Sequence, residues 1–490
     1  MKEFNLISSP FWQKKDLGKA IPQSPHAVSV ALPTWKDIID YEEKDPDCIR
    51  SLTSIYPRFG LNPLIQEIAQ KALVKGNLKD WTAWPYPNKS CATKAQDYCL
   101  NNSNNCSTEI FDVLGLKCLV ADKDATPAAK SFWQHTGLGA SSRLAAIALN
   151  KEYNPSPVEG VKAREVLQIR LGKIYQCNKN LISLHPSGMA ALTTALEVIN
   201  TIKPGGATVQ IGFPYVDVLK LPQVIFNGGI LLEETNPNNI EKKLELYQPA
   251  AVIIELPSNP MLRSVDIKKI SEIAHSKGIP VIIDDTIGSA VNVDVIPYAD
   301  LIFSSLTKSF AGKGDIMAGS LVVSPFSNWE KEFREIISSN SIAELSAPDS
   351  IALEKSSRDI EVRIPQLNHS CLALKTKLED HPNIKEIFHP EFCPNFRQMM
   401  RRNAGYGCLL SFELKGGLEQ AQKVYDNLQV CKGPSFGTNF TLASPYVLLA
   451  HYNELSWAEK CGIPPHLLRI SVGLEKEEDL WARFKQALTA

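Results

Sequence analysis

A single lysine stands between two apolar segments of the sequence, where a basic side chain is unexpected. Lys308 lies within "DLIFSSLTKSFAGKGDIMAGSLVVSP", which runs from Asp300 to Pro325. Strand-forming residues precede the lysine, and small residues lead from it to a second apolar segment. Most lysines occupy exposed positions such as surface turns. A lysine between buried strands favours another role, in which its amine forms a covalent bond with a bound group.

Several other apolar segments end in residues that could bind a ligand. These residues are Ser187, Gly188, Met189, Tyr215, Asp284, Ser305 and Thr307. Each alone is weak evidence, because an acid after a strand is usually a turn or cap, and Ser-Gly before a helix is usually an N-cap. In open α/β sheets, however, ligands bind outside the carboxyl ends of the strands. We therefore expect these residues to surround one ligand.

The set matches the needs of one cofactor, pyridoxal 5'-phosphate. Its aldehyde needs a lysine and its pyridine nitrogen needs a carboxylate, roles that suit Lys308 and Asp284. Its ring needs an aromatic face, which Tyr215 can supply. Its phosphate needs hydroxyl groups and the free N–H groups of a helix N-terminus. The expected phosphate ligands are Ser187, Gly188, Met189, Ser305 and Thr307.

Residues at strand ends need a sheet that positions them, and the sequence predicts one whose strands are buried on both faces. The apolar segments that suit such strands are LISLHP, ATVQIGFP, GGILLEE, AAVIIELP, IPVIIDD, DLIFSSL and GSLVVSP. Several alternate with helical stretches, such as residues 188–203 and 267–278. Strand–helix alternation, with strands that lack a period of two, indicates a mainly parallel α/β sheet. We expect this large domain over residues 131–350, a smaller α+β domain over 351–490, and an extension of short helices and loops over 1–130.

Five motifs between His185 and Glu475 resemble those of the cystathionine γ-synthase family. They are HPSGMAAL, IELPSNPMLRSVDI, VIIDDTIG, SSLTKSFAG and LLRISVGLE. The N-terminal segments PHAVSVALPTWKDIIDYEEKDP, YPRFGLNPLI and FWQHTGLGASSR are similar to the long fungal-type members of that family. The resemblance covers about residues 20 to 490 and implies a fold-type I pyridoxal-phosphate transferase.

The resemblance also implies roles for residues outside the strand ends. Arg469 would clamp the α-carboxylate of the substrate, a bidentate task that lysine performs poorly. Ser435 in "GPSFG" would lie beside that carboxylate, and Asn259 near the cofactor. Arg143, which follows Ser141 and Ser142 where many relatives have Tyr-x-Arg, would contact the phosphate across a dimer interface. A homodimer or homotetramer with shared active sites is therefore expected.

A second departure concerns the aromatic residue expected on the cofactor ring. Many relatives have Tyr-Gly-Gly where this chain has Tyr215-Val216-Asp217. We expect Tyr215 to stack on the cofactor ring, although the two residues that follow it differ from those of many relatives.

The composition excludes several other classes of protein. With 44% hydrophobic and 21% charged residues, the chain is typical of soluble globular proteins. A formal net charge of -1 gives no reason to expect a nucleic-acid or membrane partner. The N-terminus lacks the features of a signal peptide, so we expect a cytoplasmic protein. The eleven cysteines show neither a disulfide framework nor the Cys-x-x-Cys spacing of a zinc site, and no metal is expected.

The resemblance implies an enzyme of transsulfuration in methionine biosynthesis. The leading hypothesis is γ-replacement, in which L-cysteine displaces the acyl group of an O-acyl-L-homoserine to give L-cystathionine. Sulfhydrylation and γ-elimination use the same electron sink, and only the fungal-type N-terminal half favours the first reaction. A non-catalytic relative would lack Lys308, Asp284 or Arg469, and all three are present. A nucleotide-binding oxidoreductase fits less well, because Gly137-Leu138-Gly139 lacks the third glycine of that fingerprint.

Overall fold

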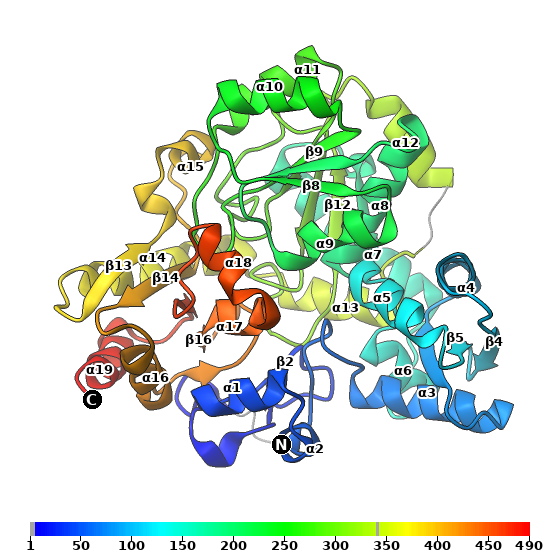
Figure 1. The fold of residues 1–490 in the computed structure, drawn as a ribbon, viewed down its shortest axis with the longest axis horizontal. Coiled ribbons are helices and arrows are strands. Elements are labelled where there is room, and N and C mark those ends of the chain that lie inside the picture. Colours follow the sequence, from blue (N-terminus) through cyan, green and yellow to red (C-terminus); the bar gives the residue numbers. More distant parts are fainter. Residues whose placement is uncertain (1–4, 340–342) are drawn as a thin grey trace.

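The computed structural model describes residues 5–339 and 343–490, and a seven-stranded sheet lies at its centre (Figure 1). Its strands are β6 (Ile182–His185), β7 (Thr208–Ile211), β8 (Gly229–Leu232), β9 (Ala251–Glu255), β10 (Val281–Asp284), β11 (Leu301–Ser305) and β12 (Gly319–Val323). Their order is β6-β12-β11-β10-β9-β7-β8, and only β12 runs antiparallel to its neighbours. Each strand lies in a segment that the sequence predicts as a strand, so the mainly parallel α/β sheet is confirmed.

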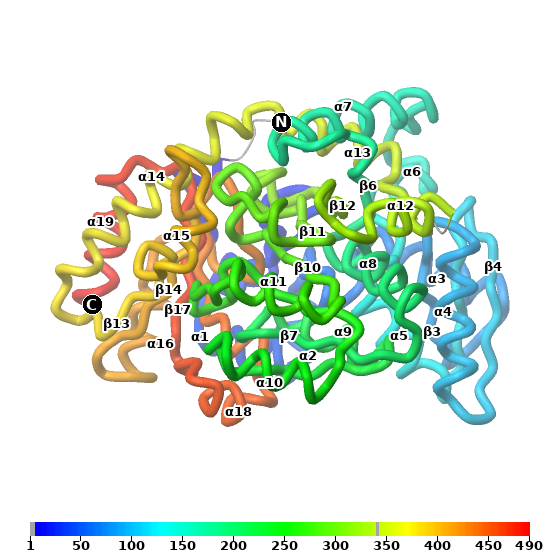
Figure 2. Tube along the Cα trace, turned by 90° about the horizontal axis from the view of Figure 1, so that it is seen from above, coloured from blue at the N-terminus to red at the C-terminus, as the bar shows by residue number. Residues whose placement is uncertain are grey.

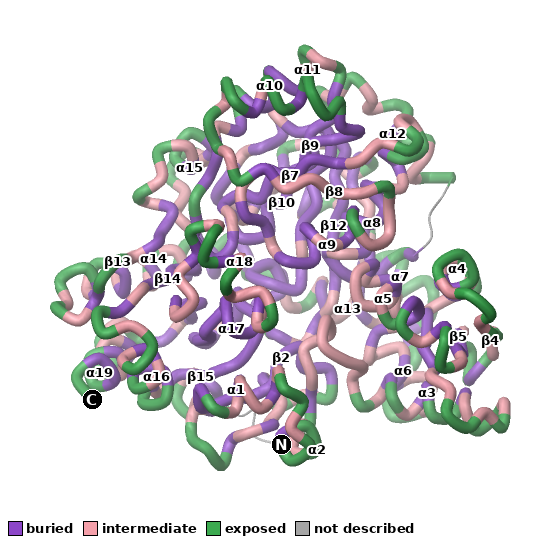
Figure 3. The backbone as a smooth tube through the Cα atoms, in the orientation of Figure 1, coloured by how far each residue is buried: buried purple, intermediate pink, exposed green. Residues whose placement is uncertain are grey.

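Apolar side chains cover both faces of this sheet, which explains the continuous apolar runs in its strands. Val252 and Ile254 of β9 pack on one face, and Ile253 packs on the other. The helices on the first face include α7 (Pro157–Tyr175), α10 (Pro237–Tyr247), α11 (Ile267–Ser276) and α13 (Ala347–Ser356). Those on the second face include α8 (Gly188–Ile202), α9 (Val216–Ile225) and α12 (Glu330–Ser339). Figure 3 shows most of these strands as buried, whereas β8 at the edge of the sheet is largely of intermediate burial.

A five-stranded sheet forms the C-terminal part of the molecule. In spatial order its strands are β13 (Ile384–Phe388), β14 (Leu409–Leu414), β17 (Leu468–Ser471), β16 (Leu442–Ser444) and β15 (Cys431–Lys432). Neighbours are antiparallel except β15 and β16. Helices α14 (Ile360–Glu379), α16 (Gly417–Asn427) and α19 (Glu477–Leu488) pack on it. Shorter helices are α15 (Pro394–Met399), α17 (Tyr446–Ala450) and α18 (Leu455–Lys460).

The N-terminal region contains a three-stranded antiparallel sheet that the sequence did not predict. Its strands, in the order β3-β5-β4, are β3 (Thr82–Tyr86), β5 (Leu116–Ala121) and β4 (Thr108–Val113). The surrounding helices are α3 (Pro63–Gly76), α4 (Lys89–Asn102), α5 (Thr126–Thr136) and α6 (Ser142–Ala148). Leu114 and Gly115, both with positive φ, join β4 to β5 as a tight hairpin requires. In Figures 1 and 2 this sheet and the C-terminal sheet lie on opposite sides of the central sheet.

The first residues of the chain pack on the C-terminal sheet rather than on the N-terminal one. They contain β1 (Ala20–Ile21), β2 (Ser29–Val30), α1 (Trp35–Glu42) and α2 (Pro46–Ser51). Trp35 and Ile38 share an apolar core with Leu428 and Val430. The boundaries that we expect near residues 130 and 350 stay a prediction. Within the described ranges, no helix is long and apolar enough to cross a membrane.

Candidate active site

A cavity lies at the carboxyl ends of the central strands and is also lined by residues of the N-terminal region. Residues that line it from the strand ends, from the loops that follow them and from α8 and α9 include Ser187, Gly188, Met189, Tyr215, Asp217, Glu255, Asn259, Asp284, Thr286, Ser305, Thr307 and Lys308. Those from the N-terminal region include His26, Tyr56, Arg58, Asn62, Trp133, Gln134 and Ser142. The structure thus brings together all the cofactor-binding residues that we expect except Arg143.

Lys308 follows β11 and directs its amine into this cavity. Its Nζ donates to the hydroxyl of Tyr56 at 3.2 Å and to Oγ of Ser435 at 3.0 Å. The rings of Tyr56 and Phe436 lie 5.1 and 4.9 Å from Nζ. No carboxylate of the described chain forms an ion pair with it, although its side chain is only 7% exposed. A buried amine that faces hydroxyl groups and open space is suited to covalent chemistry.

The first turn of α8 approaches the end of β11 closely enough to form an anion cradle. A Cβ on Gly188 would lie 2.8 Å from Cβ of Ser305, so only glycine permits this approach. Ser187 caps the helix, accepting from the N–H of Ala190 at 3.0 Å. The first N–H groups of a helix have no partner within it and attract phosphate. The hydroxyl of Thr307, which we also expect at the phosphate, is bonded to the backbone N–H of Ala318 at 3.0 Å.

Asp284 ends β10 as a buried carboxylate on the cavity wall. Its Oδ1 accepts from the N–H of Thr286 at 2.9 Å. Burial raises the pKa of Asp284 to about 6, against the opposing effect of the hydrogen bonds from Thr286. No cation of the described chain pairs with this carboxylate. A protonated ring nitrogen would supply the missing positive charge, so the residues present fit pyridoxal phosphate.

The predicted substrate-binding residues meet in an adjoining smaller cavity. Arg469 of β17 donates to Oδ1 of Asn259 at 3.2 Å and to the carbonyl of Ser435 at 3.0 Å. Its guanidinium lies 4.4 Å from the ring centre of Tyr446. It is buried and, within the described residues, has no acidic partner; burial lowers its pKa. An incoming carboxylate would neutralise this arginine with bidentate geometry.

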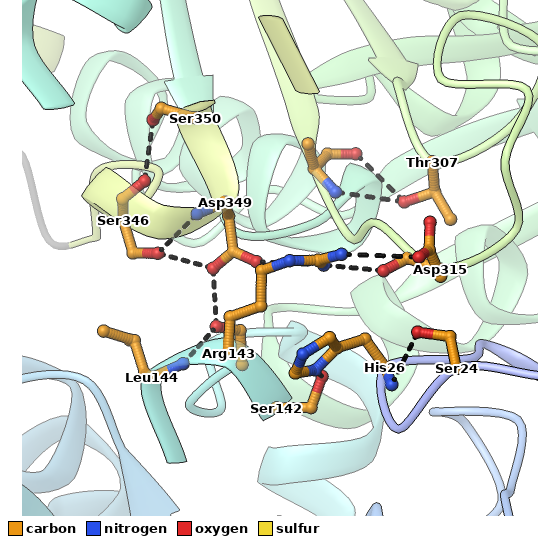
Figure 4. A network of polar contacts seen from close by, with 12 residues as sticks. Ser24, His26, Ser142, Arg143, Leu144, Thr307, Asp315, Ser346, Asp349 and Ser350 are labelled. Carbon is orange, nitrogen blue, oxygen red and sulfur yellow. Dashed lines mark hydrogen bonds and ion pairs between the residues drawn. The ribbon is translucent and has the colours of Figure 1, made fainter. Parts of the chain in front are cut away.

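Arg143 lies outside this arrangement. On α6, its guanidinium donates to the carbonyl of Asp315 at 2.6 Å, and carboxylate oxygens of Asp315 and Asp349 lie at 3.5 and 3.7 Å (Figure 4). Ser141 and Ser346 also donate to Asp349, each at 2.5 Å. These contacts hold Arg143 within its own chain, and its expected contact with the phosphate of a second subunit stays a prediction.

Two cavity residues that sequence reasoning missed are Tyr56 and Arg58. Both belong to the segment between α2 and α3, and Tyr56 contacts Lys308. A signal was present, because the Tyr-x-Arg pattern that is missing at residues 141–143 occurs at Tyr56-Pro57-Arg58. The structure places this pattern, rather than Arg143, on the cavity wall.

His26 ties the same N-terminal segment to the cavity wall. Its Nδ1 lies 3.0 Å from Oγ of Ser142 (Figure 4). Its Nε2 lies 2.6 Å from a carboxylate oxygen of Glu152. Both His26 and Ser142 line the cavity. The extension of short helices and loops, to which the sequence pattern alone assigns no chemistry, therefore contributes residues to the cavity wall.

Two family models match the chain. The model described as "Cys/Met metabolism PLP-dependent enzyme" matches residues 157–489. The model described as "Fungal trans-sulfuration enzyme, N-terminal domain" matches residues 63–141. The first covers the central and C-terminal sheets, and the second covers the three-stranded sheet, so both parts of the resemblance seen in the sequence are confirmed.

Similar proteins and structures agree with these matches. The chain is 29% identical to a Neurospora crassa protein named cystathionine gamma-synthase, over 96% of this chain and 98% of that protein. It is 30% identical to a Streptantibioticus cattleyicolor protein named L-2-amino-4-chloropent-4-enoate dechlorinase/desaturase, over 96% of this chain and 97% of that protein. A solved structure of cystathionine gamma synthase from Xanthomonas oryzae pv. oryzae, with aminoacrylate and cysteine, has a TM-score of 0.60 at 21% identity. That structure covers 69% of this chain and 88% of its own, and shows that the fold is shared.

Proposed function

The chain belongs to the PLP-dependent enzymes of cysteine and methionine metabolism, and on this premise we propose that it is a cystathionine γ-synthase. It replaces the acyloxy group on the γ-carbon of an O-acyl-L-homoserine with the sulfur of L-cysteine. The γ-carbon–oxygen bond breaks, a carbon–sulfur bond forms, and the products are L-cystathionine and a carboxylic acid that carries the thiol proton. The relative named cystathionine gamma-synthase supports this choice within the family.

The observation that carries the proposal is the unpaired Arg469 beside the cavity of Lys308. An amino-acid substrate needs one group for its α-carboxylate and another for chemistry at its carbon chain. Arg469, held by Asn259 and Ser435, supplies the first, and Lys308 supplies the second. The cationic arginine and the reactive lysine both face Tyr56, Tyr215 and Phe436, so one bound amino acid can reach both.

The residues of the chain divide the remaining work. Bound pyridoxal phosphate supplies an electron sink for a substrate that loses its α-proton. Lys308 would hold the cofactor, and its Nζ would take protons from the α- and β-carbons of the substrate and return them after the nucleophile has added. Asp284 would accept from the ring nitrogen, and Tyr215 would supply an aromatic face. The residues that would hold the phosphate are Ser187, Gly188, Met189, Ser305 and Thr307.

A second candidate function is elimination at the γ-carbon without a nucleophile. The observation that favours it is the relative named dechlorinase/desaturase, which is as similar to this chain as the cystathionine gamma-synthases are. Lys308, Asp284 and Arg469 would serve both reactions, because both begin with loss of the α-proton. Sulfhydrylation with sulfide is the third reaction that these residues allow.

A steady-state panel separates these reactions. O-acetyl-, O-succinyl- and O-phospho-L-homoserine are each supplied with L-cysteine, with sulfide and with no nucleophile, and L-2-amino-4-chloropent-4-enoate is supplied alone. We expect the best acyl donor to react fastest with cysteine and to give cystathionine. Faster turnover with sulfide, or with no nucleophile, would overturn the proposal in favour of the corresponding sibling reaction.

The cellular setting and assembly follow from the same proposal. We place the enzyme in the cytoplasm, in transsulfuration toward methionine, as a homodimer or homotetramer that shares its active sites. If Arg143 acts across the interface, co-expressed Lys308→Ala and Arg143→Ala chains regain activity that each parent lacks. Verified mixed dimers without recovery would show that each site is built within one chain.

A further inference from the structure

Glu255 is a buried carboxyl group at the end of β9 to which the reaction described above gives no role. It is 5% exposed and lines the cavity of Lys308. It belongs to the segment IELPSNPMLRSVDI, in which only Asn259 has an expected function. Within the described residues, no basic side chain forms an ion pair with Glu255. A buried carboxyl group without a counter-ion must be stabilised by hydrogen bonds instead.

One oxygen atom of Glu255 holds two loops of the site. Its Oε2 accepts from the backbone N–H of Tyr215 at 3.0 Å and from the backbone N–H of Asn259 at 3.1 Å. Tyr215 lies in the loop after β7 and Asn259 in the loop after β9, and these two strands are neighbours in the central sheet. A carboxyl oxygen has two lone pairs, so a single atom can accept both bonds. This atom therefore fixes the position of one loop relative to the other.

The second loop continues the connection to the buried arginine. Asn259 is 2% exposed, and its Oδ1 accepts from Nη1 of Arg469 at 3.2 Å. A displaced backbone at Asn259 would displace the acceptor that orients the guanidinium. Bidentate binding of a carboxylate depends on the orientation of that planar group. Glu255 is thus connected by hydrogen bonds both to the residue expected on the cofactor ring and to the cation expected at the substrate.

The neighbouring carboxylate favours an uncharged Glu255. Asp284 is its cross-strand partner in the parallel pair β9–β10. Burial raises the pKa of Glu255 well above its usual range, and the charge of Asp284 raises it further. The pKa of Asp284 rises only to about 6. Two adjacent buried carboxyl groups do not both ionise readily, so Glu255 keeps the proton and Asp284 the charge. An uncharged carboxyl group can still accept hydrogen bonds.

We propose that Glu255 is a positioning residue whose Oε2 is the common acceptor that holds Tyr215 at the cofactor site and Asn259 at Arg469. The role needs the length of the side chain and its acceptor oxygen, but not a negative charge. The inference rests on the proposed function in one respect, which is Arg469 as the residue that binds the α-carboxylate. It does not depend on the nucleophile that the enzyme uses.

Two substitutions separate the reach of Glu255 from its charge. Glu255→Gln removes the charge but keeps an acceptor oxygen at the same distance from the backbone, so it should keep both hydrogen bonds. Glu255→Asp keeps the carboxyl group but is one methylene shorter, so its oxygens should no longer reach both N–H groups. Both changes are small, and circular dichroism checks that each variant is folded.

The test measures binding to the full-length protein rather than turnover. L-Alanine has the α-amino and α-carboxylate groups of the substrate but no group to expel, and its Kd follows from the change in the visible absorption band of the bound cofactor. The Kd for pyridoxal phosphate follows from titration of protein from which hydroxylamine has removed the cofactor. We expect Glu255→Asp to raise each Kd about fivefold, the factor that one net hydrogen bond represents. Glu255→Gln should leave both close to the wild-type values.

A matched control variant distinguishes positioning from general damage to the fold. Glu475 is 4% exposed and accepts from the backbone N–H of Thr441 at 2.7 Å, but it lines neither cavity of the site. Glu475→Asp should therefore leave both dissociation constants unchanged, even where it lowers the thermal midpoint.

A double-mutant cycle tests whether Glu255 acts on the substrate through Asn259. Once Asn259→Ala has removed the contact with Arg469, Glu255→Asp should weaken L-alanine binding less than it does in the wild type. Wild-type constants in folded Glu255→Asp, equal losses in Glu255→Asp and Glu255→Gln, or an undiminished effect on the Asn259→Ala background would overturn the proposal. A failure of the proposed reaction would appear instead in the nucleophile panel, with these dissociation constants unaffected.

Discussion

Lys308 and Lys432 are both buried, but their surroundings differ. The surroundings of Lys308 suit a chemical role, whereas those of Lys432 suit a structural one. Lys432 is fully buried in the C-terminal sheet and donates to two backbone carbonyls, of Pro33 at 2.8 Å and of Asp426 at 3.0 Å. Lys308 donates to two hydroxyl groups and borders a cavity. Aromatic rings lie near both amines, 4.9 Å away in each case for Tyr425 and Phe436.

The comparison shows that burial of a lysine is a poor guide to its role. Carbonyl oxygens can only accept, so those at Lys432 fix the amine as a cross-link between the N-terminal segment and the C-terminal sheet. Hydroxyl groups can accept or donate. The hydroxyl groups at Lys308 therefore do not fix which partner of each hydrogen bond carries the proton. The open space beside Lys308 then admits a ligand that Lys432 could not reach.

The largest expected effect is a difference in kcat between variants of the two lysines. Lys308→Ala should reduce kcat by about 10²- to 10⁴-fold, because it removes both the attachment point and the group that moves protons. Lys432→Met should keep kcat close to that of the wild type. Both are measured at saturating substrate in the best condition of the nucleophile panel. Equal losses in the two variants would contradict the division of roles.

A smaller effect is expected from substitution of Arg469, the buried cation near Lys308. Arg469→Ala should lower kcat/KM by a factor that corresponds to about 2–5 kcal/mol, the usual cost of losing one partner of a buried charge pair. The loss should appear mainly in KM, with the absorption spectrum of the bound cofactor intact. Arg469→Lys, which keeps the charge but not the fork, should recover only part. Near-normal kinetics in Arg469→Ala would contradict its role at the carboxylate.

The smallest effect concerns stability, and it belongs to the Lys432 region. Lys432→Met leaves two buried carbonyls without a donor and should cost about 1–3 kcal/mol, measured as a lower urea midpoint. Burial lowers the pKa of Lys432 to about 7 from 10.5. Between these values the unfolded chain binds more protons than the folded one, so the contribution of Lys432 to stability rises with pH. The gap between wild type and Lys432→Met should therefore widen from pH 7 to 9; a constant or shrinking gap would contradict this.

The parts of the site that sequence reasoning placed correctly are those that strands position. Lys308 and Asp284 follow continuous apolar runs, and parallel strands bring their carboxyl ends to one edge. The N-terminal sheet was missed because β3 contains Pro85 and β4 is mostly half-exposed, which weakens the strand pattern. The sequence showed Asp217 only as a departure from the Tyr-Gly-Gly of many relatives. Its contacts could not be predicted, because its partners Arg58 and His135 lie far away in sequence and meet it only in the folded chain.

The most direct test of the account is to locate the lysine that holds the cofactor. Borohydride reduction of the purified yellow protein, followed by digestion and mass spectrometry, marks the attached lysine permanently. The account predicts loss of the visible absorption band and a pyridoxyl group on Lys308, with Lys432 unmodified. A pyridoxyl group on Lys432 or any other lysine, or a protein that carries no cofactor, would contradict it.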